Sequence, residues 1–243
     1  SKNYAPLEKL LTKYGPDVLR LWVLSQDYTK DLKFSNESLA RTVEKYKKFR
    51  NTLRFCLQNL EDFDGKEVAV TKYLNKVQLG EMTRVLNRTK QLVEDHNFAE
   101  VVHLLTLYCE QLSSEFFTML KDSLYCDGKN SSERRECQWM LWKVLDFLVR
   151  MMMPLLPITV EEVYQTKQAW DYPCSLWLTW PETTEQPMSV EWLQNLKGAV
   201  NQWVEMNRDT VKSVASLKVT ANLPASADLQ MVSEYLGCAE VES

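Results

Sequence analysis

The sequence has few of the residues that interrupt helices, because its 243 residues include only 6 glycines and 8 prolines. The glycines are scattered singly, so the chain has no Gly-rich loop of the kind that holds phosphate groups. Only 2 histidines occur, and neither His96 nor His103 has the cysteine or carboxylate neighbours of a metal site. The scarcity of glycine and proline favours long helices. We expect no catalytic constellation and no metal site.

Long apolar runs and paired cysteines are missing as well. No apolar stretch reaches the roughly 20 residues that span a bilayer, and charges and prolines interrupt the most apolar segment, 139–158. The 6 cysteines form no CxxC pair, and Cys56, Cys109 and Cys137 fall on apolar helical faces. We therefore expect buried free thiols, no membrane partner, and a reducing intracellular compartment, either the cytoplasm or the mitochondrial matrix.

The chain does contain a series of amphipathic segments. Helix-starting residues stand before several of them, namely Ser35, Asn97, Ser131 or Ser132, and Thr159. Apolar residues three and four positions apart predict helices near residues 17–23, 35–63, 74–94, 97–124, 132–153 and 159–168. Because the connections between these helices are short, the sequence predicts a mainly α fold built as an antiparallel helical bundle.

The C-terminal part of the chain has a different pattern. Residues 175–180 alternate between apolar and polar types and lie between two prolines, which predicts a short extended or irregular crossing. Ser189 is expected to cap a long helix. Two segments, 216–222 and 238–241, are predicted as strands on either side of a helix at 228–236. This pattern predicts a small α+β subdomain.

These patterns divide the chain into three parts. We expect residues 1–32 to form a junction segment, 33–170 the helical bundle and 171–243 the α+β subdomain. Residues 182–243 carry 4 basic and 9 acidic side chains, so the last part is acidic and is a poor binder of phosphate.

Positive charge is concentrated in the helix predicted at 35–63. Between Ser35 and Leu60 there are six basic and two acidic residues, although the whole chain has a net charge of −4. At about 100° per residue, Lys47, Arg50 and Arg54 share one face of this helix, beside its apolar face. We call these three residues the basic row. It is either an ordinary solvated face, with one arginine in a structural ion pair, or a phosphate-binding surface.

Three other features also allow two interpretations. Glu161 and Glu162 fit the first turn of a helix better than an acid–base pair. Residues 151–153 are three methionines, which fit the core of the bundle better than a partner groove. Trp177 and Trp180 either fill a seam between subdomains or stack on nucleic-acid bases.

Several ordered pieces of the sequence occur together in one known family. They are strongest up to about residue 170 and comprise residues 14–22, 25–28, 46–55, 59–60, 62–63, 112–113, 121–125, 134–135 with 138, 153–157 and 161–163. In this order they resemble the C-terminal part of isoleucine–tRNA synthetases, a class I synthetase family. The run Arg50–Phe55 separates that family from its valine and leucine relatives better than any other stretch.

The resemblance implies an anticodon-binding bundle whose partner is an isoleucine-accepting tRNA. It makes phosphate contacts plausible for eight basic side chains: Lys45, Lys47, Lys48, Arg50, Arg54, Lys121, Arg134 and Arg135. Arg50 has a second interpretation, as a buried structural partner of a carboxylate such as Asp122. Single-stranded anticodon bases would need aromatic or arginine planes for recognition, and the sequence alone does not identify these.

The resemblance places the chemistry outside these residues. In such enzymes ATP and Mg²⁺ act in a catalytic domain, and a Lys-Met-Ser-Lys-Ser loop lies in the chain just before this region. Here only Ser1-Lys2-Asn3 remains of a Ser-Lys-Ser-x-Gly-Asn pattern. We therefore expect this chain to need no cofactor, to bind RNA, and to be unable to form aminoacyl-adenylate alone. Three roles stay open: a tRNA-positioning domain of an isoleucine–tRNA ligase, a free-standing relative that acts in RNA folding, splicing or translational control, and a protein-interaction scaffold.

Overall fold

The structure is a computed structural model, and it describes residues 6–32, 34–167, 170–183, 191–208, 210–211, 213–223 and 228–242. Its contacts divide the chain into two compact units, Ser1–Val70 with Met82–Thr184 and Thr71–Glu81 with Glu185–Ser243. The first unit is helical and the second combines helices with two short strands, as the sequence predicts. The predicted cap at Ser189 and the residues Ser1-Lys2-Asn3 lie outside the described part. The domain boundaries after residues 32 and 170 stay predictions.

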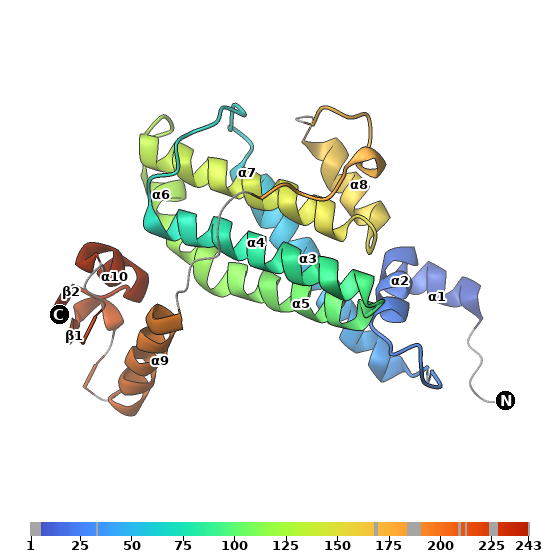
Figure 1. Cartoon of the computed structure of the whole chain (residues 1–243), viewed down its shortest axis with the longest axis horizontal. Coiled ribbons are helices and arrows are strands. Elements are labelled where there is room, and N and C mark those ends of the chain that lie inside the picture. The colour runs from blue at the N-terminus through green and yellow to red at the C-terminus, as the bar shows by residue number, and fades with distance from the viewer. Residues whose placement is uncertain are drawn as a thin grey trace. The chain divides into compact units, whose positions relative to one another are not determined.

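The first unit is a bundle of long helices. Its main members are α3 (Asn36–Asn59), α5 (Phe98–Gln111), α7 (Ser132–Met152) and the later part of α4 (Tyr73–Glu94). Figure 1 shows these helices side by side, with the chain reversing direction between α4 and α5. Contacts of α3 with both α5 and α7 hold the bundle together. The predicted antiparallel bundle is confirmed.

The core of the bundle lies along α7, which buries side chains on most of its circumference. Met140, Leu141, Leu145 and Leu148 are fully buried, and the Phe147 ring meets Tyr108 of α5 edge-on at 5.8 Å. In this half of α7 the charged residues Lys143, Asp146 and Arg150 recur at three- and four-residue spacing, so they share one stripe and leave the rest of the helix surface to the core. All six cysteines are free thiols, and the three predicted to be buried are buried: Cys56, Cys109 and Cys137.

The helix predicted at 97–124 is interrupted. It is divided by a π-helical turn, η1 (Leu112–Phe116), into α5 and α6 (Phe117–Cys126). Two hydroxyl groups donate to backbone carbonyls around this turn. Ser113 Oγ donates to the carbonyl of Cys109 at 2.9 Å, and Thr118 Oγ1 donates to the carbonyl of Ser113 at 3.4 Å. Such side-chain bonds compete with the regular helical pattern, which gives a local reason for the turn.

Two short helices, α1 (Leu7–Tyr14) and α2 (Pro16–Leu24), precede the bundle. Gly15 separates them with φ 78°, a left-handed conformation that glycine adopts without strain. Val18 and Trp22 of α2 form a small core with Leu39 of α3. The two helices therefore pack against the start of α3.

The start of α8 (Pro157–Thr166) differs from the prediction. The helix begins at Pro157 and not after Thr159, because proline suits the first helical position and lacks the amide proton that a cap would satisfy. Thr159 lies inside the first turn, where Asp17 of α2 accepts its hydrogen bonds. The predicted capping box at Thr159 is therefore wrong.

Residues after α8 form an irregular segment with one turn of 3₁₀ helix, η2 (Ser175–Trp177). Both Ser175 N–H and its hydroxyl donate to one carboxylate oxygen of Glu161, at 2.8 and 2.6 Å. Glu161 thus anchors this segment to α8, which gives it a structural role. Trp177 and Trp180 are exposed, so in the described residues they do not fill a buried seam.

The second unit contains α9 (Glu191–Met206), η3 (Val214–Ser216), β1 (Lys218–Thr220), α10 (Leu229–Leu236) and β2 (Glu240–Glu242), with the first part of α4. The strands pair in parallel, with Val219 opposite Val241, so the two predicted strands are confirmed in shortened form. Gly237, with φ 68°, ends α10 as predicted, and its N–H donates to the carbonyl of Ser233.

Candidate nucleic-acid interface

The face of α3 that carries the basic row is set by the opposite, buried face. Phe49, Leu53 and Cys56 are fully buried, which turns residues 47, 50 and 54 outward. The start of the helix is fixed by Ser35, whose side chain accepts from Ser38 N–H at 3.0 Å, in the predicted capping position. The basic row is therefore exposed because of how α3 is anchored and packed.

Two of the predicted RNA contacts on α3 have carboxylate neighbours. Lys47 pairs with Glu44 at 2.7 Å on the same helix, and Lys48 pairs with Glu110 of α5. All four side chains are largely exposed, and exposed ion pairs are weak, on the order of 0–1 kcal/mol. Either lysine can therefore exchange its carboxylate for a phosphate at small cost.

Arg50 and Arg54 are cations of this face that have no partner among the residues that the structure describes. Both are exposed, and neither forms an ion pair or hydrogen bond within the residues that the structure describes. Lys45 is half-buried, and it too forms no ion pair or hydrogen bond within the described residues. Arg50 does not pair with Asp122, which is itself exposed on α6. The interpretation of Arg50 as a buried structural partner is wrong, because its position on α3 points it to solvent.

Lys121 is exposed on α6 and lies one turn beyond Phe117. The Phe117 ring stacks on Phe55 of α3 with centroids 4.3 Å apart and an interplanar angle of 17°. This contact joins α6 to α3 immediately beside Arg54. The structure therefore places Lys121 one helical turn from the point where α6 contacts α3.

Arg134 differs from the cations of α3 and α6, because its guanidinium already donates hydrogen bonds to other groups of the protein. It forms a two-pronged ion pair with Asp62, at 2.8 and 2.9 Å, and donates to the carbonyls of Leu124 and Lys129. Four of its five N–H donors are used, and only 15% of the side chain is exposed. The geometry gives Arg134 a structural role, and RNA contact by this residue stays an untested prediction.

Arg135 belongs to the same cluster around the end of α3. It donates to the carbonyl of Asp62 at 3.0 Å, to the Gln138 side chain at 2.9 Å and to Asn130 at 3.1 Å. The buried amide of Gln138 donates in turn to Asp62 at 2.7 Å. We call Asp62, Arg134, Arg135 and Gln138 the Asp62 cluster. It ties the loop after α3 to the start of α7.

The electrostatics of the Asp62 cluster follow from these contacts. The guanidinium of Arg134 holds the pKa of Asp62 well below its ordinary value, against the opposing effect of burial, and Gln138 adds to the lowering. Nearby, Lys167 donates to the carbonyls of Leu60 and Phe63 at 2.5 and 3.4 Å, and burial lowers its pKa. These groups bind the end of α3 and leave little charge for a ligand.

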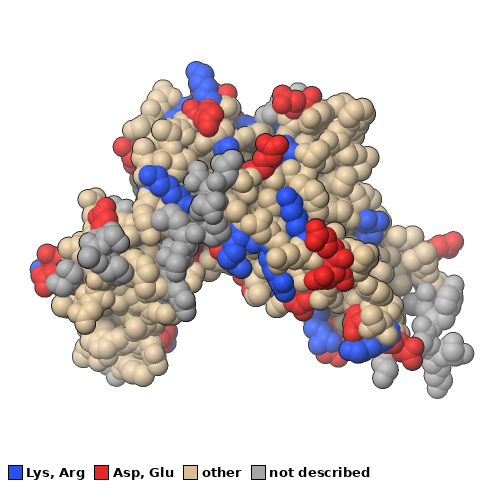
Figure 2. Space-filling view, viewed as in Figure 1, with Lys and Arg blue, Asp and Glu red and all other residues tan. Residues whose placement is uncertain are grey.

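A second group of exposed cations lies on α4 and was not predicted. Arg88 and Lys90 are exposed there, and Arg88 has only a 3.4 Å hydrogen bond to Gln91 in the described residues. Figure 2 shows basic side chains gathered over the middle of the bundle, where α4 and α7 lie in Figure 1. The sequence could have indicated Arg88 and Lys90, because both lie on the predicted helix 74–94 at positions that are exposed.

Comparison with known families gives this arrangement its context. The family described as "Anticodon-binding domain of tRNA ligase" matches residues 75–233, which is well over half of the chain. The chain belongs to this family. The matched residues run from α4 to α10, so they include Lys121, Arg134 and Arg135, whereas the basic row on α3 precedes them.

Several isoleucine–tRNA ligases are similar to this member of the anticodon-binding family over a longer stretch. The chain is 33% identical to that of Petrotoga mobilis over 236 residues, which cover 95% of this chain and 25% of the relative. It is 31% identical to that of Fervidobacterium nodosum over 227 residues, or 92% and 24%. A third, from Desulforudis audaxviator, is 39% identical over 194 residues, or 78% and 19%. The predicted resemblance is confirmed, and the chain spans about a quarter of the length of these relatives.

The remaining candidate features of this anticodon-binding family member are its methionine run, His96, and possible metal or membrane-spanning sites. Of the three methionines predicted in the core, Met151 and Met152 are buried and Met153 is half-buried. His96 is exposed with φ 55°, and its carbonyl accepts from the Tyr28 hydroxyl at 3.1 Å. In the described part of the chain, no three His, Cys, Asp or Glu residues gather as metal ligands, and no helix combines the length and apolar character needed to cross a bilayer.

Proposed function

We propose that this chain binds an isoleucine-accepting tRNA and positions it for ATP-dependent aminoacylation by a catalytic domain that is not among these 243 residues. The observation that carries the proposal is the pair Arg50 and Arg54, exposed on one helical face and free of partners among the described residues. Arginine suits phosphate because its planar fork of donors matches the phosphate oxygens.

The surrounding cations extend this surface. Lys47 and Lys48 have exchangeable carboxylate partners, Lys45 lies on the same helix, and Lys121 stands on the adjacent α6. Contacts of this kind fix the position of an RNA without reading its sequence. Isoleucine specificity is inferred from the similar ligases named above. The free thiols suit a reducing compartment, the cytoplasm or the mitochondrial matrix.

The test is a double charge reversal, Arg50→Glu with Arg54→Glu. Affinity for isoleucine tRNA is expected to fall about tenfold or more near 0.1 M salt, and the slope of log affinity against log salt is expected to decrease by about 2, because two phosphate contacts are lost. Filter binding or fluorescence anisotropy over a salt series measures both quantities.

A matched control reverses two cations elsewhere on the first unit, Lys30→Glu with Lys66→Glu, whose side chains are 79% and 82% exposed. This control has the same change in net charge and is expected to leave the slope close to that of the unchanged chain. Equal losses for the two double variants would show that net charge, and not the basic row, controls binding, and would contradict the proposal.

A further inference from the structure

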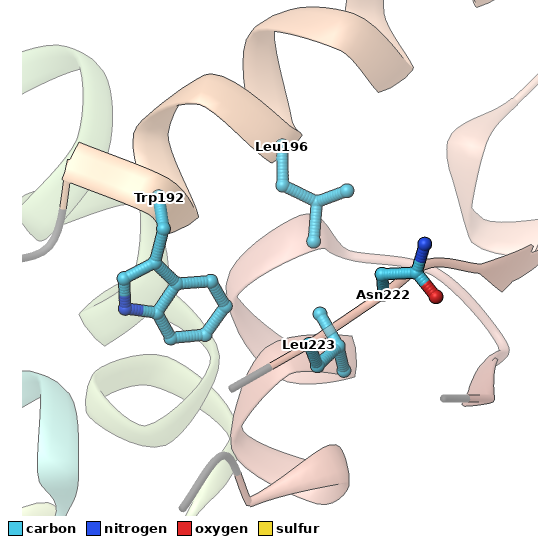
Figure 3. A pocket seen from close by; sticks show the side chains of 4 residues that line it. All are labelled: Trp192, Leu196, Asn222 and Leu223. Carbon is cyan, nitrogen blue, oxygen red and sulfur yellow. The ribbon is translucent and has the colours of Figure 1, made fainter. Parts of the chain in front are cut away.

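The second unit contains an open pocket of about 470 Å³, lined by Trp192, Leu196, Asn222 and Leu223. Pockets that bind small ligands or single bases commonly have volumes of about 300–1,000 Å³. Figure 3 shows Trp192 and Leu196 projecting from α9 on the side where Leu223 lies, with Asn222 next to Leu223 on the chain that follows β1 and its amide directed away from Trp192. None of these four side chains is charged, so the pocket is suited to a flat, largely apolar group and not to a phosphate.

The walls of the pocket are held by the core of the unit. Leu193 and Val200 of α9 are buried, as are Val232 and Leu236 of α10, and the Lys197 ammonium lies 4.4 Å from the centre of the Tyr235 ring. Trp192 and Leu196, one turn apart, lie beside this buried face. On the other side, Ala221 N–H donates to the carbonyl of Glu242 at 3.0 Å, which fixes the chain just before Asn222.

Two side chains of the pocket carry polar groups, the Asn222 amide and the Trp192 indole N–H. In the residues that the structure describes, neither the Asn222 amide nor the Trp192 indole N–H forms a hydrogen bond with another residue. An amide can both donate and accept, so it can recognise the edge of a nucleobase, and an indole ring offers a face for stacking. A half-buried ring, two leucines and one free amide are the components of a base-recognition site.

We propose that this pocket receives one unstacked base of the anticodon loop, which stacks against Trp192 while its edge bonds to the Asn222 amide. The inference rests on the proposed function and assigns it a base-reading site. All four lining residues lie within residues 75–233, the segment that matches the anticodon-binding family. In this proposal the basic row contacts phosphates and the pocket contacts one base. The acidic charge of residues 182–243 is compatible with base stacking, because stacking needs no phosphate contact.

The experiment uses the 243-residue chain and a labelled anticodon stem–loop of isoleucine tRNA. Trp192→Ala is expected to weaken binding at least about fivefold, the lower end for loss of one base stack, without changing the salt slope. Removing one base of the loop to leave an abasic position is expected to weaken binding to the unchanged chain by a similar factor. The same abasic RNA should then bind the Trp192→Ala variant no more weakly than the intact RNA does.

Matched variants separate the pocket from folding and from general aromatic exposure. Trp203→Ala removes a second tryptophan of α9 that is 50% exposed and does not line the pocket, and it is expected to change nothing. Asn222→Leu alters an exposed side chain and should change the preference among bases at the matching loop position. This variant carries the test if Trp192→Ala does not fold.

The outcomes distinguish this inference from the proposed function. If the stem–loop binds with a salt slope that depends on Arg50 and Arg54, but Trp192→Ala and Asn222→Leu bind as the unchanged chain does, the pocket is not a base site and the proposed function stands. Additive losses for Trp192→Ala and every abasic RNA also overturn the inference. If the unchanged chain shows no salt-dependent RNA binding, the proposed function fails, and the inference fails with it.

Discussion

Replacing Arg134 by alanine is expected to lower the free energy of unfolding of the bundle by about 2–4 kcal/mol and to leave the tRNA affinity of the folded chain unchanged. The reason is that the variant leaves Asp62, whose side chain is 24% exposed, without its two-pronged partner, and frees the carbonyls of Leu124 and Lys129. Urea unfolding followed by circular dichroism measures the first quantity, and anisotropy with labelled tRNA the second.

Two further variants sharpen this result. Arg134→Lys keeps the charge and loses the planar fork, so it is expected to recover only a minor part of the stability. Arg41→Ala is the control, since its side chain is 71% exposed and its 3.8 Å contact with Glu37 is weak, and its effect should stay within about 0.5 kcal/mol. Unchanged stability with weakened tRNA binding in Arg134→Ala would instead assign Arg134 to the RNA-contacting surface.

The same cluster predicts a dependence on pH. Because Arg134 lowers the pKa of Asp62 in the folded chain, the folded state binds this proton less readily than the unfolded state. The stabilisation is therefore fully present above the ordinary aspartate pKa of about 4 and is lost as the pH falls below it. The difference in unfolding free energy between the unchanged chain and Asp62→Asn should shrink as the pH falls below about 4, and a constant difference would contradict this origin.

The features that the sequence predicted are those with local causes. Ser35 caps α3 through a residue three positions away, and Phe49 and Leu53 alternate with the basic row at helical spacing. Each can be recognised from a few neighbouring residues, since helix caps and amphipathic faces are short-range patterns. The same periodicity placed Arg50 and Arg54 beside the apolar face, but for Arg50 it left burial against a carboxylate open, and the structure shows this side chain exposed.

The features that the sequence did not predict depend on contacts between distant residues. Arg134 and Asp62 are 72 positions apart, so the local pattern around Arg134 gave no sign that a carboxylate would occupy its guanidinium. The pocket in the second unit has the same character, because Trp192 and Asn222 come to line one pocket only after α9 and the chain beyond β1 have folded. In both cases, which donor is free for a ligand depends on tertiary packing, which a single sequence does not show.

Asp17 provides the most distant of these contacts and the second large expected effect. This buried carboxylate accepts from the N–H and hydroxyl of Thr159, both at 2.7 Å, and from the N–H of Ile158 at 3.4 Å. The Tyr46 hydroxyl lies 3.1 Å from Thr159 Oγ1, and because the single Thr159 hydroxyl proton goes to Asp17, Tyr46 must be the donor. Asp17 thus joins α2, α3 and the positive end of α8.

Asp17→Ala is expected to reduce the free energy of unfolding by about 3 kcal/mol, because it leaves the buried N–H and hydroxyl of Thr159 without an acceptor at a helix start. Asp17→Asn keeps one acceptor oxygen and is expected to recover about half of the loss. Chemical denaturation of the three chains in parallel gives these values. Asp31→Ala, an exposed aspartate without a partner among the described residues, is the control and should have no measurable effect.

The Asp17 contact also has a consequence for the proposed function. α1 and α2 pack against the start of α3, and Asp17 adds a fixed link from α2 to α8, so these two helices have two attachments to the bundle. Losing one attachment should increase amide hydrogen exchange in α2 and the first turn of α8 by more than in α3, whose exchange should rise only as far as the lower global stability requires, while tRNA affinity stays close to that of the unchanged chain. Uniformly faster exchange across the whole bundle would show that Asp17 supports global stability alone, and that α2 is not held in place specifically by this contact.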